Sequence, residues 1–357
     1  MPEQRVEYIA AEPLPDGLDA PSLRRRALRV VGVLVIVALV AVLAPGLGEL
    51  RTRLAGAQAA WLVAAAVLEL LSCLSYIVIF KPVFCSRMTW RSAYELGISE
   101  LAVGSLVPAG GAGGLAFGAW ALRRVGMPTR DIARATVAFF VLTSAANFVA
   151  VVVIGLLMWV GVGPHRSPLL TLLPAALAAL AIFVVAAVPT IAARRTARPE
   201  QPGRLRRWRD GAGEALDTGV REAGRVLRRR DWLVIVGSLG YWAFDNAVLW
   251  ACLHAVGLSA PVTLVLMGYL IGQLGALLPI PGGVGAIDGG LLGTLVVYGL
   301  PAAPTAAAIL LYRVILFWLP LVLGGIAFDS LRQGLNDPDR PDLCEPFASI
   351  PTQPQVT

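Results

Sequence analysis

Long apolar runs separated by short basic loops restrict the fold of this chain more than any other feature of its sequence. About 20 apolar residues are needed to cross the hydrocarbon core of a bilayer as a helix. Six runs approach or exceed that length, at residues 30–45, 59–80, 132–162, 168–192, 232–256 and 304–328. Charged residues make up 15% of the chain, whereas a soluble domain carries about 25%. The sequence therefore predicts an all-α, polytopic membrane protein with about six full spans.

The basic residues indicate how these spans are oriented. The net charge of +7 could suggest nucleic-acid binding, but the arginines lie between the apolar runs, as the positive-inside rule expects. Basic stretches at residues 24–29, 81–91, 123–134 and 194–230 mark cytoplasmic loops. We therefore expect no nucleic-acid partner, and a multi-pass protein of the plasma (inner) membrane with both termini in the cytoplasm. A signal peptide would resemble the first run, but this run begins late, so we expect a retained span.

Polar segments divide the chain into regions. Residues 1–23 are proline-rich and polar, which predicts a disordered cytoplasmic N-terminus. A transmembrane domain is expected over residues 24–330, followed by a cytoplasmic tail at 331–357. Within this domain, a first half at 24–192 and a second half at 232–330 flank a basic cytoplasmic linker at 193–231.

The linker has the pattern of an amphipathic helix. Between Arg194 and Arg230 it carries 12 arginines and five acidic residues. Its apolar residues recur every three or four positions: Leu205, Trp208, Ala212, Leu216, Val220, Ala223 and Leu227. Glycines within the segment oppose a helix by about 1 kcal/mol each relative to alanine. We expect a helix that lies on the cytoplasmic face of the membrane.

Two further apolar segments are each broken in the middle by proline and glycine. The first runs over residues 92–122 and is broken at 108–114; the second runs over residues 261–298 and is broken at 279–285. No half of either segment reaches the length of a span. Each segment is therefore predicted to be a re-entrant helix hairpin.

The two breaks form an internal repeat. Leu106-Val107-Pro108-Ala109-Gly110-Gly111-Ala112-Gly113 resembles Leu278-Pro279-Ile280-Pro281-Gly282-Gly283-Val284-Gly285, and a Gly-x-Pro follows each, at 126–128 and 299–301. Three complete crossings separate the hairpins, so they should enter the bilayer from opposite faces as an inverted repeat. In secondary transporters, such matched breaks mark the substrate site near the membrane midplane.

The chemistry of the breaks favours a hydrated path for a lipid headgroup. Unwound backbone in hydrocarbon costs several kcal/mol per unpaired group, so it requires contact with protein or water. Helix N-termini after the breaks would suit a phosphate. Alternatively, the glycines only allow tight helix packing, as we expect for Gly268-x-x-x-Gly272. The residues predicted to line the path are Pro108, Gly110, Gly111, Gly113, Pro279, Pro281, Gly282, Gly283, Gly285, Asp288 and Arg313.

Ionisable residues inside apolar runs are the remaining candidates, because they usually face a cavity or a partner. A pair between Asp288 and Arg313 is the leading hypothesis, and Arg313 could also bind a lipid phosphate. An ion pair that only locks the two halves together is the alternative. Glu69 and Asp245 are candidates for proton coupling. The weaker candidates are Glu95 and Glu100 at the cytoplasmic entrance, and Asn246 and Gln273 as hydrogen-bonding links between helices.

No catalytic or metal-binding pattern is evident in the sequence. His165 and His254 are isolated, and we find no Ser/His/Asp set and no clustered carboxylates. We therefore expect no cofactor, no metal site and no enzymatic activity. Two alternatives stay open, a membrane-bound transferase that modifies a lipid and a non-catalytic membrane scaffold.

The second half resembles a known family. The residues 278–288, the Gly-x-Pro at 299–301 and Leu311-Tyr312-Arg313 are similar to the C-terminal signature of the lysylphosphatidylglycerol synthase transmembrane family, which is flippase-like. The resemblance covers roughly residues 25–330. Asp288 stands where that family commonly has glutamate, and the first break carries only alanine and glycine where a charged residue is frequent.

The resemblance implies a function. The best-known members move an aminoacylated phospholipid across the inner membrane and carry a soluble aminoacyl-transferase domain after the membrane part. About 29 residues follow the last predicted span, too few for a domain, so synthase activity is not implied. We expect a flippase or transporter for a phospholipid or lipid-linked headgroup. Its partner would be a membrane phospholipid, anionic or aminoacylated, and a homo-oligomer is one possible arrangement.

Overall fold

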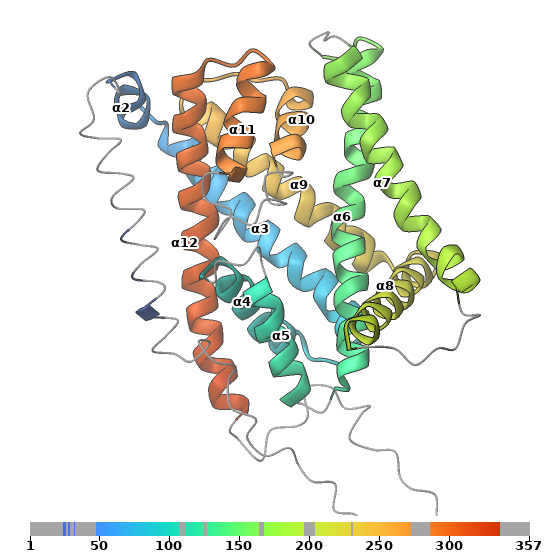
Figure 1. Cartoon of the computed structure of the whole chain (residues 1–357). Coiled ribbons are helices and arrows are strands. Elements are labelled where there is room, and N and C mark those ends of the chain that lie inside the picture. Colours follow the sequence, from blue (N-terminus) through green and yellow to red (C-terminus); the bar gives the residue numbers. More distant parts are fainter. Residues whose placement is uncertain are drawn as a thin grey trace, which may run out of the picture.

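The computed structural model describes residues 24–25, 28, 32, 48–106, 112–124, 127–163, 168–195, 204–229, 231–272 and 286–335. Among these residues the fold is all-α, without a strand, as predicted (Figure 1). The expected first span at residues 30–45 falls outside the described residues, apart from Gly32. The same holds for residues 1–23 and 336–357, which were assigned to the terminal segments.

Within the described ranges, five helices are long and apolar enough to cross a bilayer. These are α3 (Ala59–Phe84), α6 (Thr129–Trp159), α7 (Pro168–Arg195), α9 (Trp232–Ala255) and α12 (Ala302–Leu335). Each corresponds to a span predicted from the sequence, and the structure thus confirms a polytopic membrane protein. Their bounds differ from the predicted ones by a few residues, because helices continue past the apolar run into polar loops.

Four shorter helices form two pairs. The first pair consists of α4 (Trp90–Leu106) and α5 (Ala112–Arg124), and the second of α10 (Val262–Gly272) and α11 (Ala286–Val297). Within each pair the two helices contact one another. Figure 1 shows α4 and α5 in the lower half of the molecule and α10 and α11 in the upper half. The connecting residues 107–111 and 273–285 lie outside the described residues.

Helices α3 and α9 lie side by side through the centre of the molecule (Figure 1). They are antiparallel, since the Gln58 amide before α3 donates to the Ala255 carbonyl at the end of α9 over 2.9 Å. Gly237 of α9 allows the close approach, because a Cβ there would lie 2.8 Å from the backbone nitrogen of Ile79. A side chain at this position would push the two central helices apart.

Buried apolar side chains form two separate cores, one around each short pair. The core around α4 and α5, which we call the inner core, includes Phe80, Leu96, Phe117, Phe139 and Leu331, from α3, α4, α5, α6 and α12. The core around α10 and α11, which we call the outer core, includes Leu249, Met267, Leu291, Leu295 and Ala308, from α9, α10, α11 and α12. The long helices α3, α6, α9 and α12 take part in both, so they connect the two cores.

The basic linker contains the predicted helix, α8 (Arg204–Arg228). It contacts α6 and α7 and lies across their lower ends in Figure 1. Ala223 is buried, and a Cβ at Gly219 would lie 2.4 Å from Val137 of α6. One face of α8 is thus packed against protein, which the expectation of a helix on the membrane surface did not include.

A short helix that we did not predict, α2 (Gly48–Ala55), contacts α12.

Two adjacent glycines of α12 provide a test of the inner packing. A Cβ at Gly324 would lie 2.3 Å from the Ala102 Cβ and 2.7 Å from the Ile98 carbonyl oxygen of α4, whereas one at Gly325 would meet nothing within 4 Å. We predict that Gly324→Ala destabilises the protein by about 1–3 kcal/mol, the usual cost of overpacking. Gly325→Ala should leave stability unchanged or slightly raised. Thermal melting in detergent, followed by size-exclusion chromatography, measures both; equal melting temperatures for the two variants would contradict this packing.

Candidate functional site: a polar layer between the two cores

Polar residues gather where the inner core ends and the outer core begins. On the four long helices they are Glu69 and Ser72 of α3, Thr143 and Asn147 of α6, Asp245 and Asn246 of α9, and Tyr312 and Arg313 of α12. Glu69 and Arg313 lie ten and eleven residues from the first residues of their helices, Ala59 and Ala302, or about 15 Å at 1.5 Å per residue. That is half of a hydrocarbon core of about 30 Å, so this polar layer lies near the membrane midplane.

Asp245 links three helices. Its two carboxylate oxygens accept hydrogen bonds from the hydroxyls of Tyr269 on α10 and Tyr312 on α12, the latter over 3.1 Å. Both tyrosines are buried. The second short pair is therefore attached to the central helix α9 through a half-buried carboxylate.

The predicted pair between Asp288 and Arg313 is present. The Arg313 Nε donates to Asp288 Oδ1, which joins the start of α11 to α12. The two side chains are 24% and 25% exposed, so they are reachable from a neighbouring space. The Arg313 Nη2 atom is buried without a hydrogen-bond partner. A guanidinium with an unused donor is suited to an additional oxygen ligand.

Glu69 is the most deeply buried acid of the polar layer, at 5% exposure. Its Oε1 accepts a hydrogen bond from the Cys73 thiol over 3.6 Å, while its Oε2 has no partner. Glu69 and Asp245 interact electrostatically. The two acids singled out from the sequence for proton coupling thus lie near one another, on α3 and α9.

Further buried polar atoms of this region lack partners. They are the side-chain oxygens of Asn147, Ser238 and Asn246 and the indole nitrogen of Trp242. An unpaired buried polar atom costs about 1–3 kcal/mol, and such atoms usually mark a site for water or ligand.

Asn246 was expected to link two helices, and this expectation was wrong: its Nδ2 donates to the Trp242 carbonyl of the same helix. Gln273, the other expected link, lies outside the described residues.

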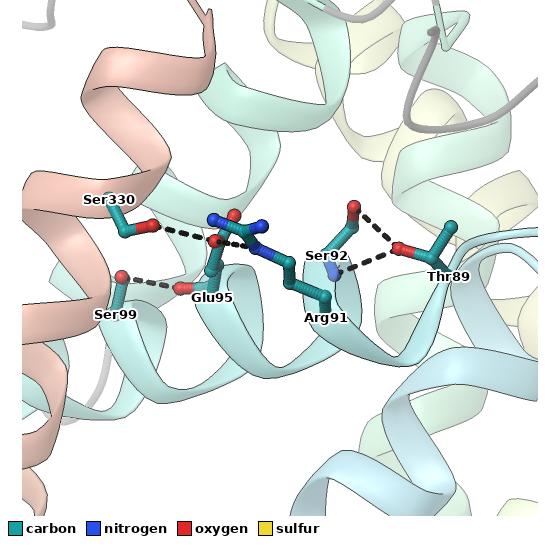
Figure 2. Close-up of polar contacts among 6 residues, drawn as sticks. All are labelled: Thr89, Arg91, Ser92, Glu95, Ser99 and Ser330. Carbon is teal, nitrogen blue, oxygen red and sulfur yellow. Dashed lines mark hydrogen bonds and ion pairs between the residues drawn. The ribbon is translucent and has the colours of Figure 1, made fainter. Parts of the chain in front are cut away.

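Glu95 and Glu100 of α4 are buried in the inner core rather than placed at an open entrance. Figure 2 shows Ser330 of α12 donating to Glu95 Oε1 over 2.7 Å, with Arg91 Nε on the same oxygen over 3.0 Å. In the same view, Thr89 accepts from the Ser92 amide over 3.1 Å and so caps α4. Glu95 therefore fastens α4 to α12, whereas Glu100 is hydrogen-bonded to Tyr76 of α3.

Most of the glycines and prolines predicted to line a headgroup path cannot be placed. Pro108, Gly110, Gly111, Pro279, Pro281, Gly282, Gly283 and Gly285 lie outside the described residues. Gly113 is described and is buried near the start of α5. Gly268 and Gly272 pack against Leu295 and Leu291 of α11, so here the expected role in helix packing is confirmed.

The described part of the polar layer combines one guanidinium with three carboxylates, Glu69, Asp245 and Asp288. Such a set can bind a phosphate through Arg313 and exchange protons at the acids. Within the described ranges, no three His, Cys, Asp or Glu side chains are grouped so as to hold a metal ion.

Sequence reasoning missed Tyr269, Tyr312 and Asn147. The position of Tyr312 next to Arg313 was a signal that could have identified it as a site residue. Tyr269, in contrast, cannot be distinguished in the sequence from any other residue of an apolar run.

Comparison with known proteins agrees with the membrane fold. Residues 29–324 match the family model of the lysylphosphatidylglycerol synthase TM region. A UPF0104 membrane protein of Methanothermobacter thermautotrophicus is 40% identical over 91 residues, which cover 25% of this chain and 26% of that protein. A match to a UPF0104 membrane protein of the same organism is 28% identical over 114 residues, covering 29% and 34% of the two chains.

The chain spans about a quarter to a third of the length of these curated relatives. The family model, in contrast, extends from the predicted first span into the last long helix and includes both short pairs and the polar layer. On this match, the chain belongs to the family of the lysylphosphatidylglycerol synthase transmembrane region.

Proposed function

We propose that this protein moves a phospholipid, or another lipid with a phosphate headgroup, across the membrane, and that the headgroup passes through the polar layer. The observation that carries the proposal is the Arg313 guanidinium near the midplane, bound to Asp288 but with a buried, unused donor. Charged groups at this depth are costly and are retained where they serve a pathway. The name of the family, which refers to a lipid synthase, supports a lipid as the substrate.

The arrangement of contacts supports an inverted repeat. Helices α3, α4, α5 and α6 would correspond to α9, α10, α11 and α12. The contacts α3·α4, α4·α5 and α5·α6 have counterparts in α9·α10, α10·α11 and α11·α12, and α3·α6 has its counterpart in α9·α12. Because α3 and α9 are antiparallel, the two short pairs would enter from opposite faces. Such repeats provide alternating access around a central site.

The glycines of the two short pairs add to this correspondence. A Cβ at Gly290 of α11 would lie 3.2 Å from the Gly272 carbonyl oxygen, and one at Gly118 of α5 would lie 2.5 Å from Glu100 Oε2. Glu100 precedes Gly118 by the same 18 positions as Gly272 precedes Gly290. A carboxylate in the first pair thus takes the place of a glycine contact in the second, and we propose that the two re-entrant hairpins differ in this way.

Removing the charge of Arg313 tests the proposal. In proteoliposomes containing fluorescent phosphatidylglycerol, we predict that Arg313→Gln lowers the rate of lipid movement between leaflets by roughly tenfold or more, or about 1.4 kcal/mol. Arg313→Lys should keep part of the activity, because a lysine retains the charge but not the planar fork. Arg225→Gln is a matched control: Arg225 is an exposed arginine of α8 that pairs with Glu222 at 2.6 Å.

The same vesicles distinguish the alternatives. Lipid movement in the wild type that is lost in Arg313→Gln and kept in Arg225→Gln supports a transporter. Chemical conversion of the headgroup would instead indicate a lipid-modifying transferase, and neither activity would indicate a scaffold. Lipid movement unaffected by Arg313→Gln would remove this residue from the path.

Impermeant thiol labelling tests the proposed orientation in the plasma membrane. Ser86 and Ser259 are exposed and lie just before α4 and α10, the first helices of the two pairs. In a background in which the native cysteines are replaced by alanine, Ser259→Cys should be labelled from outside intact cells. Ser86→Cys should be labelled only after the cells are opened, because basic loops stay cytoplasmic. Labelling of both from one side would contradict the inverted arrangement.

A further inference from the structure

We infer that a pocket beside α2 binds the headgroup of a zwitterionic phospholipid, one that carries both a phosphate and a primary amine. The pocket has a volume of about 420 Å³ and lies between α2, the start of α3 and the end of α9. We call it the α2 pocket. Its volume is within the range of small-molecule sites. The inference goes beyond the proposed function, because binding in this pocket requires no movement of lipid between leaflets.

The α2 pocket is lined by two side chains of opposite charge. Glu49 and Arg53 lie one turn apart on α2, and the Arg53 Nη2 atom is 3.7 Å from Glu49 Oε1. This distance is too long for a hydrogen bond, and both side chains are exposed, so both can bind a ligand. Arg53 also reaches the turn after α9, where a Cβ at Gly257 would lie 3.7 Å from its Nη1 atom. The guanidinium therefore spans the pocket from α2 to the end of α9.

The ends of two antiparallel helices add to this polarity. Gln58, the N-cap residue of α3, lines the pocket, and its side chain makes no capping hydrogen bond. The N-terminus of α3 is a positive pole. Ala255, the last residue of α9, also lines the pocket and accepts from the Gln58 amide over 2.9 Å. Because the C-terminus of a helix is a negative pole, the pocket offers favourable positions to an anionic and to a cationic group together.

The α2 pocket lies at the depth of lipid headgroups. The apolar span of α3 begins at Ala59, directly after Gln58. Val63, an exposed apolar residue of this span, follows Gln58 by about 8 Å at 1.5 Å per residue. The headgroup layer on each face of a bilayer is about 5–8 Å thick. Trp61 and Trp250, whose ring centroids lie 5.4 Å apart, are also of a type enriched at this boundary. A lipid can therefore place its headgroup in the pocket and its acyl chains in the hydrocarbon.

The charges of the pocket select among headgroups. The phosphate of phosphatidylethanolamine can bind the Arg53 guanidinium in a bidentate manner, while its ammonium group donates to the Glu49 carboxylate. Phosphatidylglycerol has the phosphate but no cation, so it is attracted by Arg53 and repelled by Glu49. Phosphatidylcholine has both charges, but its quaternary ammonium has no N–H to donate. We therefore expect the pocket to prefer phosphatidylethanolamine to either of the other lipids.

Lipid binding to the purified full-length protein tests this site. Native mass spectrometry of the protein in detergent measures the lipids bound as phosphatidylethanolamine, phosphatidylglycerol or phosphatidylcholine is added. The informative quantity is the change in affinity between the wild type and a pocket variant, because lipids bound elsewhere on the protein are common to both.

Two conservative variants should shift the affinities in different ways. Arg53→Gln should weaken the binding of phosphatidylethanolamine by roughly tenfold, since it removes the charged partner of the phosphate. Glu49→Gln should weaken phosphatidylethanolamine and strengthen phosphatidylglycerol, each by roughly two- to fivefold, the effect of one exposed ion pair. A variant that is merely misfolded cannot strengthen one lipid while it weakens another.

The exposed pair of Arg225 and Glu222 on α8 provides matched controls. These two side chains are 2.6 Å apart, and Figure 1 shows α8 at the lower end of the molecule and α2 at the upper end. Arg225→Gln and Glu222→Gln should leave the affinities for all three lipids unchanged. The site would be overturned if Arg225→Gln weakened phosphatidylethanolamine as much as Arg53→Gln does. It would also be overturned if Glu49→Gln shifted phosphatidylethanolamine and phosphatidylglycerol in the same direction, or if Arg53→Gln weakened phosphatidylcholine more than phosphatidylethanolamine.

A soluble headgroup separates the two sources of this chemistry. Glycerophosphoethanolamine carries the same phosphate and amine without acyl chains, and its affinity is measured by its displacement of phosphatidylethanolamine. We expect it to bind far more weakly than the lipid, because it buries no acyl chain. An affinity equal to that of phosphatidylethanolamine would assign the pocket to a soluble phosphodiester and would overturn the inference of a lipid site.

Discussion

The rest of the structure depends on the placement of ionisable groups between two apolar cores. A carboxylate or guanidinium in a medium of low dielectric constant is stable only with a partner, a proton or water. The fold meets this requirement in part. Asp288 holds Arg313, two tyrosines hold Asp245, and one oxygen of Glu69 and one nitrogen of Arg313 are left over. A core built only for stability would favour apolar residues of similar volume at these positions. A functional role therefore explains the polar layer better than a contribution to stability does.

The short helices explain how such a layer can exist at the midplane. A helix of 11 to 17 residues ends inside the bilayer, so its last turn and the following backbone must find polar partners there. Among the described residues, Asp288 in the first turn of α11 joins one such helix end to the polar layer through Arg313. Close glycine contacts, such as Gly104 with Gly114 and Gly272 with Gly290, bring the two helices of each pair together. Two separate cores then form around the pairs, instead of one continuous core.

Much of this architecture follows from the sequence. The spans, the four half-length helices and the helix of the basic linker are local properties, since they depend on runs of apolar residues, on Pro and Gly, and on helical periodicity. The pair between Asp288 and Arg313 was predictable because only a few charges lie at that depth, which leaves few ways to pair them.

Other parts depend on contacts across the fold and have no local signal. Tyr269 and Tyr312 converge on Asp245 from two helices, and neither differs in the sequence from a tyrosine of an apolar core. Asn246 bonds within its own helix because the Trp242 carbonyl is one turn away, which competes with any partner on another helix. Glu95 and Glu100 are only five residues apart, yet one is held by Arg91 and Ser330 and the other by Tyr76. That difference arises from which helices α4 contacts.

The central claim is that water reaches the polar layer between two dry cores, and thiol accessibility along one helix tests it most directly. Asn147 lies in the layer, and Val151, one turn further along α6, belongs to the outer core. In a cysteine-free background within a lipid bilayer, Asn147→Cys should react with a small hydrophilic thiol reagent, because that reaction requires a hydrated thiolate. Val151→Cys should stay unmodified. Two unreactive cysteines would show that the layer is dry and would contradict this account.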